Sequence, residues 1–440
     1  MKIVWFCIPA HGHTNPTLGL VKELTEAGHE IYYFSFKEFK EKIENVGGKF
    51  IACDDYDFEM EDKDNADRVA KDVVFSTELL VNTTLCLEDM IEKNIKEIQP
   101  DLIVTDSVAY WGKLAALKYK IPFISSTTTF AFNKESASYM KQSIWDLCKI
   151  LFSMPKINKQ LNRLKSKGYP VNNILDIIQN DNTTNTIVYT SKYYQPCSDT
   201  FSKDCYCFIG PSIRPLVTTF EKTSKITIYI SMGTVLKNGK NDFYTYCIEA
   251  LSKTDYQVII SMGKHSNDNN GKDNKDNDND NNDNNDNNDN DNNDNDNNKN
   301  NNKDEDFILK KENLPENIKI YPFVDQMAVL SISDLFITHC GMNSASEGLY
   351  FEVPLILYPQ TQEQEAVARR TEELGAGIWL KKVKNSNDIS KAIEKIINEP
   401  NYKKSAIEIS KSFKECPGVK AAKEFIEKIY QKNQQNQQNQ

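Results

Sequence analysis

The chain has 440 residues, which exceeds one ordinary domain, so we expect two or three domains. Its content of 39% hydrophobic and 26% charged residues is typical of a globular protein. The formal net charge is -10, but residues 266–303 hold eleven Asp and four Lys and therefore supply most of it. The rest of the chain is nearly neutral, which gives no support for nucleic-acid binding.

No apolar run is long enough to span a bilayer, so we expect no integral membrane association. The short apolar start leads into a His-rich segment rather than a small-residue cleavage site, which indicates a buried strand and not a signal peptide. We therefore expect a cytoplasmic protein whose ten cysteines are free thiols. Cys197, Cys205 and Cys207 lie close in sequence but lack the paired spacing of a zinc site, so no metal is expected.

The first half of the sequence alternates apolar runs with amphipathic stretches. We expect strands at residues 2–8, 30–35, 49–52, 101–106 and 121–125, and helices at residues 17–27, 37–46, 79–98 and 111–119. This alternation predicts a parallel sheet covered by helices on both faces.

A second α/β series begins near residue 225, with expected strands at residues 225–231, 256–262, 318–321, 335–338 and 354–358, and helices at residues 242–252, 325–332, 343–350 and 363–374. The expected domains are residues 1–212 and 225–415, joined by a linker at residues 213–224. A C-terminal helix and a disordered tail are expected in residues 416–440, with fraying from residue 431. The Asn/Asp-rich residues 266–306 have too few apolar side chains to order, so we expect a disordered insertion in a surface loop.

A motif of the sequence HGHTNP, residues 11–16, directly follows the first expected strand. Ligands of open α/β sheets bind at the carboxyl ends of strands, where this motif is expected to lie as a loop. The imidazole of His13, with an ordinary pKa of about 6.5, is suited to accept a proton from a hydroxyl group. Asp106 ends another expected strand and would orient that imidazole if the two strands are neighbours. The alternatives are a structural histidine and an aspartate that caps the turn at Ser107.

The most specific motif is THCGMNSASEG, residues 338–348, where a strand is expected to end and a helix to begin. Free backbone amides and the helix dipole near Asn343 and Ser344 favour a phosphate group. His339 is expected to donate to a phosphate oxygen, and Glu347 is expected to accept from ribose hydroxyls. The motif is neither a Walker loop nor a Gly-x-Gly-x-x-Gly loop.

A further polar segment, YPQTQEQ at residues 358–364, follows the next expected strand. Its neighbouring side chains Glu363 and Gln364 are suited to bind adjacent hydroxyls of a sugar. Taken alone, the segment is also compatible with an ordinary polar loop that opens a helix.

Together these segments resemble the family 1 UDP-glycosyltransferases, and most closely their bacterial macrolide-type branch. The resemblance extends from Lys2 to about Leu380, and residues 339–364 are its most specific part. It implies the GT-B fold, in which two Rossmann-like parallel-sheet domains face each other across a cleft. Residues 1–212 would then bind the acceptor, and residues 225–415 would bind the UDP-sugar donor.

The resemblance also implies a role for each matching residue. His13 matches the general base and Asp106 its orienting partner. Donor-binding roles are implied for Ser231, Gly233, Thr234, Phe323, Val324, Gln326, His339, Gly341, Asn343, Ser344, Glu347, Glu363 and Gln364. Phe323 stands where the family usually has a tryptophan that stacks on uracil, Asp325 stands where it usually has proline, and the Asn/Asp-rich insertion is foreign to the family.

The implied reaction is an inverting transfer of a sugar, with glucose as the default, from a UDP-sugar to a hydroxyl of a small lipophilic acceptor. The UDP-sugar is a co-substrate, and neither a cofactor nor a metal is expected. Aromatic residues of the first half are expected to line the acceptor pocket: Phe75, Tyr110, Trp111, Phe130 and Trp145. The alternatives left open are a transferase acting on a carrier-lipid precursor, a catalytically silent nucleotide-sugar-binding partner subunit, and a 2-epimerase.

Overall fold

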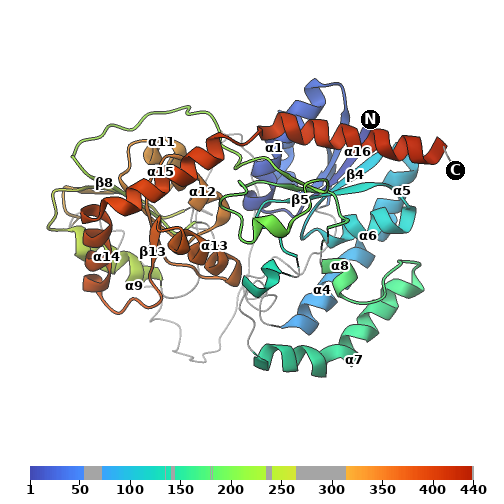
Figure 1. The fold of residues 1–440 in the computed structure, drawn as a ribbon, viewed down its shortest axis with the longest axis horizontal. Coiled ribbons are helices and arrows are strands. Elements are labelled where there is room, and N and C mark those ends of the chain that lie inside the picture. The colour runs from blue at the N-terminus through green and yellow to red at the C-terminus, as the bar shows by residue number, and fades with distance from the viewer. Residues whose placement is uncertain are drawn as a thin grey trace, which may run out of the picture.

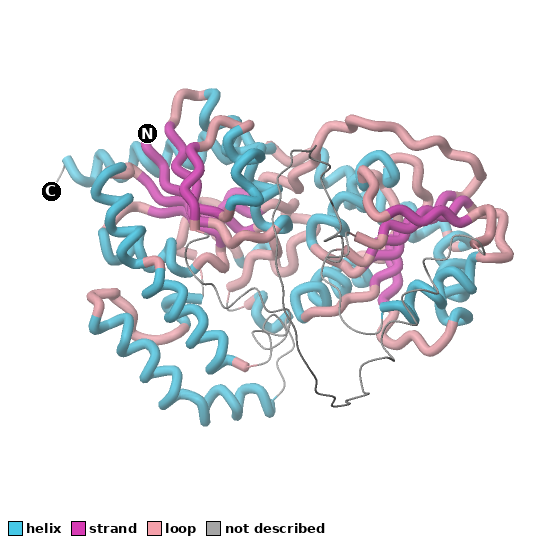
Figure 2. Tube along the Cα trace, turned by 180° about the vertical axis from the view of Figure 1, so that it is seen from behind, coloured by secondary structure: helices cyan, strands magenta, loops and turns pink. Residues whose placement is uncertain are grey.

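The computed structural model describes residues 1–53, 72–133, 135–139, 144–178, 180, 182–233, 240–263 and 314–438. The expected insertion at residues 266–306 and Thr234 lie outside the described residues. Two separate parallel sheets form the centres of two halves that lie side by side (Figures 1 and 2). The α/β architecture with two parallel-sheet domains is therefore confirmed.

The N-terminal sheet has seven strands in the order β3-β2-β1-β4-β5-β6-β7. Their bounds are β1 Lys2–Phe6, β2 Glu30–Ser35, β3 Lys49–Ala52, β4 Leu102–Asp106, β5 Phe123–Thr127, β6 Thr186–Val188 and β7 Tyr206–Phe208. Because β1 pairs in parallel with β4, the carboxyl ends of these two strands lie next to each other. The sheet thereby brings together two segments of the chain that the sequence separates by about a hundred residues.

The C-terminal sheet has six strands in the order β10-β9-β8-β11-β12-β13. Their bounds are β8 Thr227–Ser231, β9 Gln257–Ser261, β10 Ile318–Tyr321, β11 Leu335–Thr338, β12 Leu355–Leu357 and β13 Gly377–Trp379. Thr338 is the parallel partner of Ser231, so the loops that follow β8 and β11 leave the sheet side by side.

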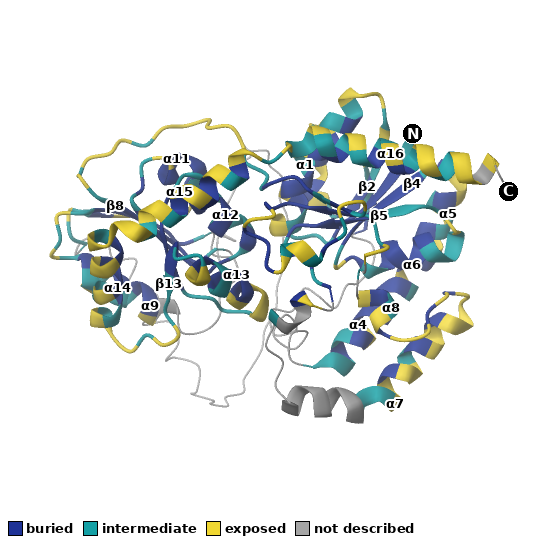
Figure 3. Ribbon diagram, viewed as in Figure 1, coloured by how far each residue is buried: buried dark blue, intermediate teal, exposed yellow. Residues whose placement is uncertain are grey.

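Helices cover both sheets, and they bury the strands while exposing their own outer faces (Figure 3). In the N-terminal half they are α1 His11–Glu26, α2 Lys40–Glu44, α4 Val73–Cys86, α5 Glu88–Ile98, α6 Tyr110–Tyr119, α7 Ile144–Ser166 and α8 Leu175–Ile178. In the C-terminal half they are α9 Lys240–Leu251, α11 Gln326–Leu330, α12 Met342–Tyr350, α13 Gln362–Glu373, α14 Ser386–Asn398, α15 Pro400–Lys414 and α16 Gly418–Gln438. Among the described residues, none of these helices has the length and apolarity needed to cross a membrane.

The start of α1 corrects one expectation, because the HGHTNP motif forms the first turns of the helix and not a loop. The backbone N–H groups of His13 and Thr14 both donate to the carbonyl of Ala10 and thereby begin the helix. Pro16 is the sixth residue of α1 and lies past the first turn, so it costs the helix the one hydrogen bond that an N–H at this position would make to the Gly12 carbonyl.

The C-terminal helix α16 crosses back onto the N-terminal half, where it packs against α1 (Figure 1). Its apolar side chains Ala422, Ile426 and Ile429 join the core that contains Trp5 of β1. The expectation of a disordered tail from residue 431 is wrong, since α16 continues to Gln438. Glutamine has good helix propensity, and a helix that is already anchored extends without a new nucleation cost.

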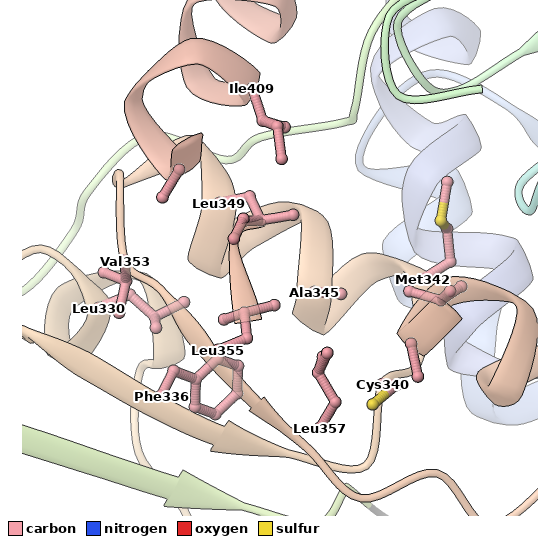
Figure 4. Close-up of a cluster of buried hydrophobic side chains, with 14 of the residues drawn as sticks. Leu330, Phe336, Cys340, Met342, Ala345, Leu349, Val353, Leu355, Leu357 and Ile409 are labelled. Atoms are coloured by element: carbon pink, nitrogen blue, oxygen red, sulfur yellow. The ribbon is translucent and has the colours of Figure 1, made fainter. Parts of the chain in front are cut away.

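One hydrophobic cluster of the C-terminal half also contains residues of the N-terminal half. It surrounds Leu349 of α12 and Leu355 of β12 (Figure 4), and Tyr194 joins it by packing edge-on against the ring of Phe413. The Tyr194 hydroxyl lies 2.6 Å from the Thr371 hydroxyl of α13. At this edge the two halves therefore share a core and a hydrogen bond.

Candidate active site

The first turn of α1 and the end of β4 bring His13 and Asp106 together. Nδ1 of His13 lies 2.7 Å from Oδ2 of Asp106, and the other carboxylate oxygen accepts a hydrogen bond from the backbone N–H of Val108 at 2.9 Å. The Asp106 side chain is 1% exposed, whereas His13 retains 16%. The carboxylate is thus held in one orientation, and the imidazole keeps access to the space between the two halves.

The hydrogen bonds of His13 favour one tautomer of the ring. Thr128 Oγ1 lies 3.2 Å from the same Nδ1 atom, so two acceptors surround it and the proton of a neutral ring belongs on Nδ1. Burial by itself lowers the pKa of His13, but the charge and hydrogen bond of Asp106, with a smaller effect of Glu363, raise this pKa to about 9. Nε2 is the atom left to accept a proton from a substrate.

Two neighbours of this pair were not expected from the sequence. Cys7, the residue after β1, donates its thiol proton to Oδ2 of Asp106 across 3.5 Å, and Thr128 follows β5. Burial raises the pKa of Cys7 well above its ordinary value, so the thiol is neutral and acts as a donor. Their positions just past the carboxyl ends of strands are the signal that would have identified them.

On the donor side, two glycines hold the ring of His339. A Cβ at Gly233 would lie 2.5 Å from Cε1 of His339, and one at Gly341 would lie 2.7 Å from its Nε2. Gly233 also has a positive φ of 70°. The loops after β8 and β11 therefore contact each other through this imidazole, beside the point where α12 begins.

A hydrogen-bonded chain forms the next part of the donor side. Gln326 Nε2 donates to Glu347 at 2.5 Å and lies 3.4 Å from Ser344 Oγ, while its Oε1 accepts from Tyr229 at 3.3 Å. Burial raises the pKa of Glu347, and Gln326 and the guanidinium of Arg214 partly offset this effect. Tyr229 and Arg214 were not expected, because a strand tyrosine and a linker arginine carry no recognisable motif.

Phe323 and Val324, which were expected to bind the nucleotide base, differ in their exposure to solvent. Phe323 is 70% exposed and therefore has a free ring face. Val324 is instead buried in the core cluster, so only its backbone is available to a ligand.

Two further contacts connect the donor side to His13. Asn343 of α12 donates from Nδ2 to the carbonyl of Gly12 across 3.0 Å. Glu363, in the first turn of α13, is close enough for its charge to act on His13, although its side chain remains exposed. Gln364 is buried, and its side-chain oxygen accepts from the backbone N–H of Gln360.

The expected acceptor residues have different positions. Burial and the charge of Asp106 raise the pKa of Tyr110 to about 12, and its side chain packs against the core cluster that contains Leu114. Phe75 lies near the start of α4 and is 9% exposed. Trp111 and Phe130 are packed in core clusters, and their place in an acceptor pocket stays a prediction, because apolar side chains follow the same sequence pattern in cores and in pockets. The side chain of Trp145 lies outside the described part of α7.

Among the described residues, no group of three or more His, Cys, Asp or Glu side chains is arranged to hold a metal ion. The thiols of Cys197, Cys205 and Cys207 are free.

The two parallel-sheet domains form the GT-B fold of glycosyltransferases, which solved structures of this class share. Residues 305–422 match the family described as UDP-glucoronosyl and UDP-glucosyl transferase. The chain is 32% identical to a Bacillus subtilis protein described as an uncharacterized UDP-glucosyltransferase, YojK, over 98% of both chains. It is 23% identical to the demethyllactenocin mycarosyltransferase of Streptomyces fradiae, over 97% of this chain and 86% of that one.

The crystal structure of the glycotransferase of kitacinnamycin has the same fold, with a TM-score of 0.76, 20% identity, and coverage of 97% of this chain and 98% of that one. The protein belongs to the family 1 UDP-glycosyltransferases, in the macrolide-type branch, and is a glycosyltransferase.

Proposed function

We propose that this enzyme transfers a sugar, glucose in the first instance, from a UDP-sugar to a hydroxyl of a small lipophilic acceptor in the cytoplasm. His13 acts as the general base and Asp106 orients it. The observation that carries this proposal is the 2.7 Å contact between His13 Nδ1 and Asp106, because it leaves Nε2 directed away from the carboxylate. Residues 1–212 would bind the acceptor and residues 225–415 the donor, with residues 213–224 as the linker.

In the proposed reaction, Nε2 of His13 removes the proton of the acceptor hydroxyl, and the oxygen forms a bond to the anomeric carbon of the sugar. The bond from that carbon to the UDP oxygen breaks on the opposite face, and its electron pair leaves with UDP, so the configuration inverts. Asp106 stabilises the imidazolium that forms. The abstracted proton then passes from His13 to solvent.

The leaving diphosphate would be bound at the start of α12. Backbone N–H groups there, with the side chains of His339, Asn343 and Ser344, supply positive potential directed at the developing charge. This arrangement supports transfer without a metal ion or cofactor. Glu347 and Gln326 are suited to the ribose hydroxyls, and Glu363 and Gln364 to the sugar.

The acceptor class is proposed from the substrates that the relatives' names give. The name of one relative refers to demethyllactenocin, which supports a small natural-product acceptor for this chain as well. Tyr110 is a candidate acceptor-side aromatic residue, since it begins α6 four positions after Asp106.

The test measures the release of UDP from UDP-glucose in the presence of a metal chelator. Phenolic, macrolide and sterol compounds are supplied in turn as acceptors, and the products are identified by mass spectrometry. We expect acceptor-dependent UDP release and a product heavier by one hexose. His13→Ala should lower the rate by about a hundredfold or more while UDP binding by calorimetry remains. Activity only after a metal is restored would contradict the metal-free mechanism, and a His13→Ala rate above about a tenth of the parent rate would contradict the base assignment.

A further inference from the structure

The side chain of Asn343 and the carbonyl of Gly12 join the donor helix to the helix that carries His13. The 3.0 Å bond connects residues 331 positions apart, and α1 contacts α12 in this region. Figure 4 shows Met342, at the start of α12, on the side of the cluster nearest α1. A Cβ at Gly12 would lie 3.9 Å from Nδ2 of Asn343, so the two helices meet in van der Waals contact here.

The carbonyl of Gly12 is available for this bond because of Pro16. In an α-helix the carbonyl of residue 12 accepts from the N–H of residue 16, but proline has no N–H. The proline ring also crowds the carbonyl four residues earlier and tilts it away from the helix axis. Asn343 therefore satisfies an acceptor that the helix itself leaves without its usual donor.

We propose that Pro16 and Asn343 are positioning residues for His13: Pro16 frees the Gly12 carbonyl, and Asn343 binds it, which fixes the base relative to the donor site. The inference rests on the proposed function, in which His13 is the base. Gly12 precedes His13 on the same helical turn, so a shift of this carbonyl moves the imidazole with it. Rates of positioned reactions are sensitive to such shifts, because the reacting atoms must meet in a narrow range of distance and angle.

Other contacts between the two halves show why the bond from Asn343 to Gly12 matters for the position of His13. At the other edge, Arg370 of α13 donates to the carbonyls of Tyr194 and Tyr193 at 3.0 and 2.7 Å, and Thr371 contacts the Tyr194 hydroxyl. That edge holds α13 against the N-terminal half through hydrogen bonds in which α12 takes no part. The bond from Asn343 adds a second point of attachment next to the base.

The test is a double-mutant cycle of Pro16→Ala and Asn343→Ala, measured as kcat at saturating substrates and as the Kd for UDP. Pro16→Ala restores the helical N–H and should fold, since alanine has the highest helix propensity. We expect it to lower kcat about threefold to fivefold, the effect of one ordinary hydrogen bond, with the Kd for UDP unchanged. In the Asn343→Ala background, the same change should leave kcat unaltered.

Ser344→Ala is the matched control, because Ser344 lies at the same helix start but its hydroxyl lies near Gln326 and not near α1. Pro16→Ala should lower kcat in this background as much as in the parent enzyme. Equal effects of Pro16→Ala with and without Asn343 would overturn the inference.

A second readout does not depend on turnover. The charged groups that act on His13 are Asp106 of β4 and Glu363 of α13. If the loss of this bond lets the Gly12 carbonyl shift, the imidazole moves relative to Asp106 and Glu363, their effect on it weakens, and the pKa of His13, followed by NMR, should fall. This fall is expected in Asn343→Ala and Pro16→Ala but not in Ser344→Ala. An active His13→Ala variant would overturn the proposed function, and the inference with it. An inactive His13→Ala variant, together with an additive cycle and an unchanged pKa of His13, would overturn this inference alone.

Discussion

Asp106 accepts a hydrogen bond from His13 at 2.7 Å, although the two residues are 93 positions apart. The pair exists because β1 and β4 are parallel neighbours, so the loop after β1 passes the end of β4. A buried carboxylate at this distance favours the protonated imidazole and raises the pKa of His13 to about 9. At neutral pH the imidazole of His13 is therefore mostly protonated, although the proposed reaction needs it neutral so that it can accept a proton.

The first prediction concerns pH. Because His13 must be neutral to act as a base, kcat/KM should rise with pH and level off above an apparent pKa near 9, which this parameter reports for the free enzyme.

The stability of the folded protein should change with pH in the opposite direction. The folded pKa is raised, so the stabilisation by charged His13 is complete below the ordinary pKa and is lost as pH rises through about 9.

Asp106→Asn provides the comparison for that profile. It removes the charge that holds the proton, so the rise in kcat/KM should move to lower pH while the plateau falls, because the ring loses its orientation. The measurement is kcat/KM from pH 6 to 10 for both enzymes. A parent profile that is flat above pH 7 would contradict the raised pKa.

The second prediction concerns the thiol beside the pair. Cys7→Ala removes a donor to Asp106 and should lower kcat about threefold to fivefold, the effect of one hydrogen bond. Cys247→Ala is the matched control, because that thiol is buried in the C-terminal core away from the site. Both changes should lower the melting temperature slightly, but only Cys7→Ala should change kcat. Equal kcat values in the two variants would show that the thiol has no role at the pair.

Much of the fold followed from the sequence, since buried strands and amphipathic helices alternate with clear periods. The order of the strands did not, and with it the adjacency of His13 and Asp106 remained only a hypothesis until the sheet was known. The start of α1 was misjudged because glycine, asparagine and proline have low helix propensity, which the tertiary packing of Leu20 and Val21 outweighs.

The neighbours of the site residues were harder still to predict. Cys7 and Tyr229 each contact partners about a hundred positions away, and neither residue type marks a function in sequence. The implied roles of the donor-binding residues remain predictions. Ser231 and His339 lie at the ends of β8 and β11, and Asn343 and Ser344 lie at the start of α12, so part of this set follows the order of strand, turn and helix that a continuous motif encodes.

The third prediction uses the two glycines that follow β8 and β9. Gly233→Ala should strain a backbone with positive φ and push the ring of His339 aside, so UDP binding should weaken by about tenfold or more. Gly263→Ala has the same kind of backbone strain, with φ of 83°, but among the described residues a Cβ there meets only the carbonyl of Gly233 at 3.4 Å. Both variants should lose about 1 kcal/mol of stability. A comparable loss of UDP affinity in Gly263→Ala would mean that strain and not the displaced ring is responsible.

The last prediction concerns Phe323, which stands where the family usually has tryptophan. Its ring is 70% exposed, so it contributes little to the stability of the free protein and is available to stack on a base. Phe323→Ala should raise the Kd for UDP about threefold to tenfold, the usual effect of one aromatic contact, with an unchanged melting temperature. Phe323→Trp should bind UDP at least as tightly as the parent, because a larger ring face stacks better. Unchanged UDP affinity in Phe323→Ala would show that the nucleotide base lies elsewhere. Arg214 would then be the next candidate contact, because its charge acts on the carboxyl group of Glu347.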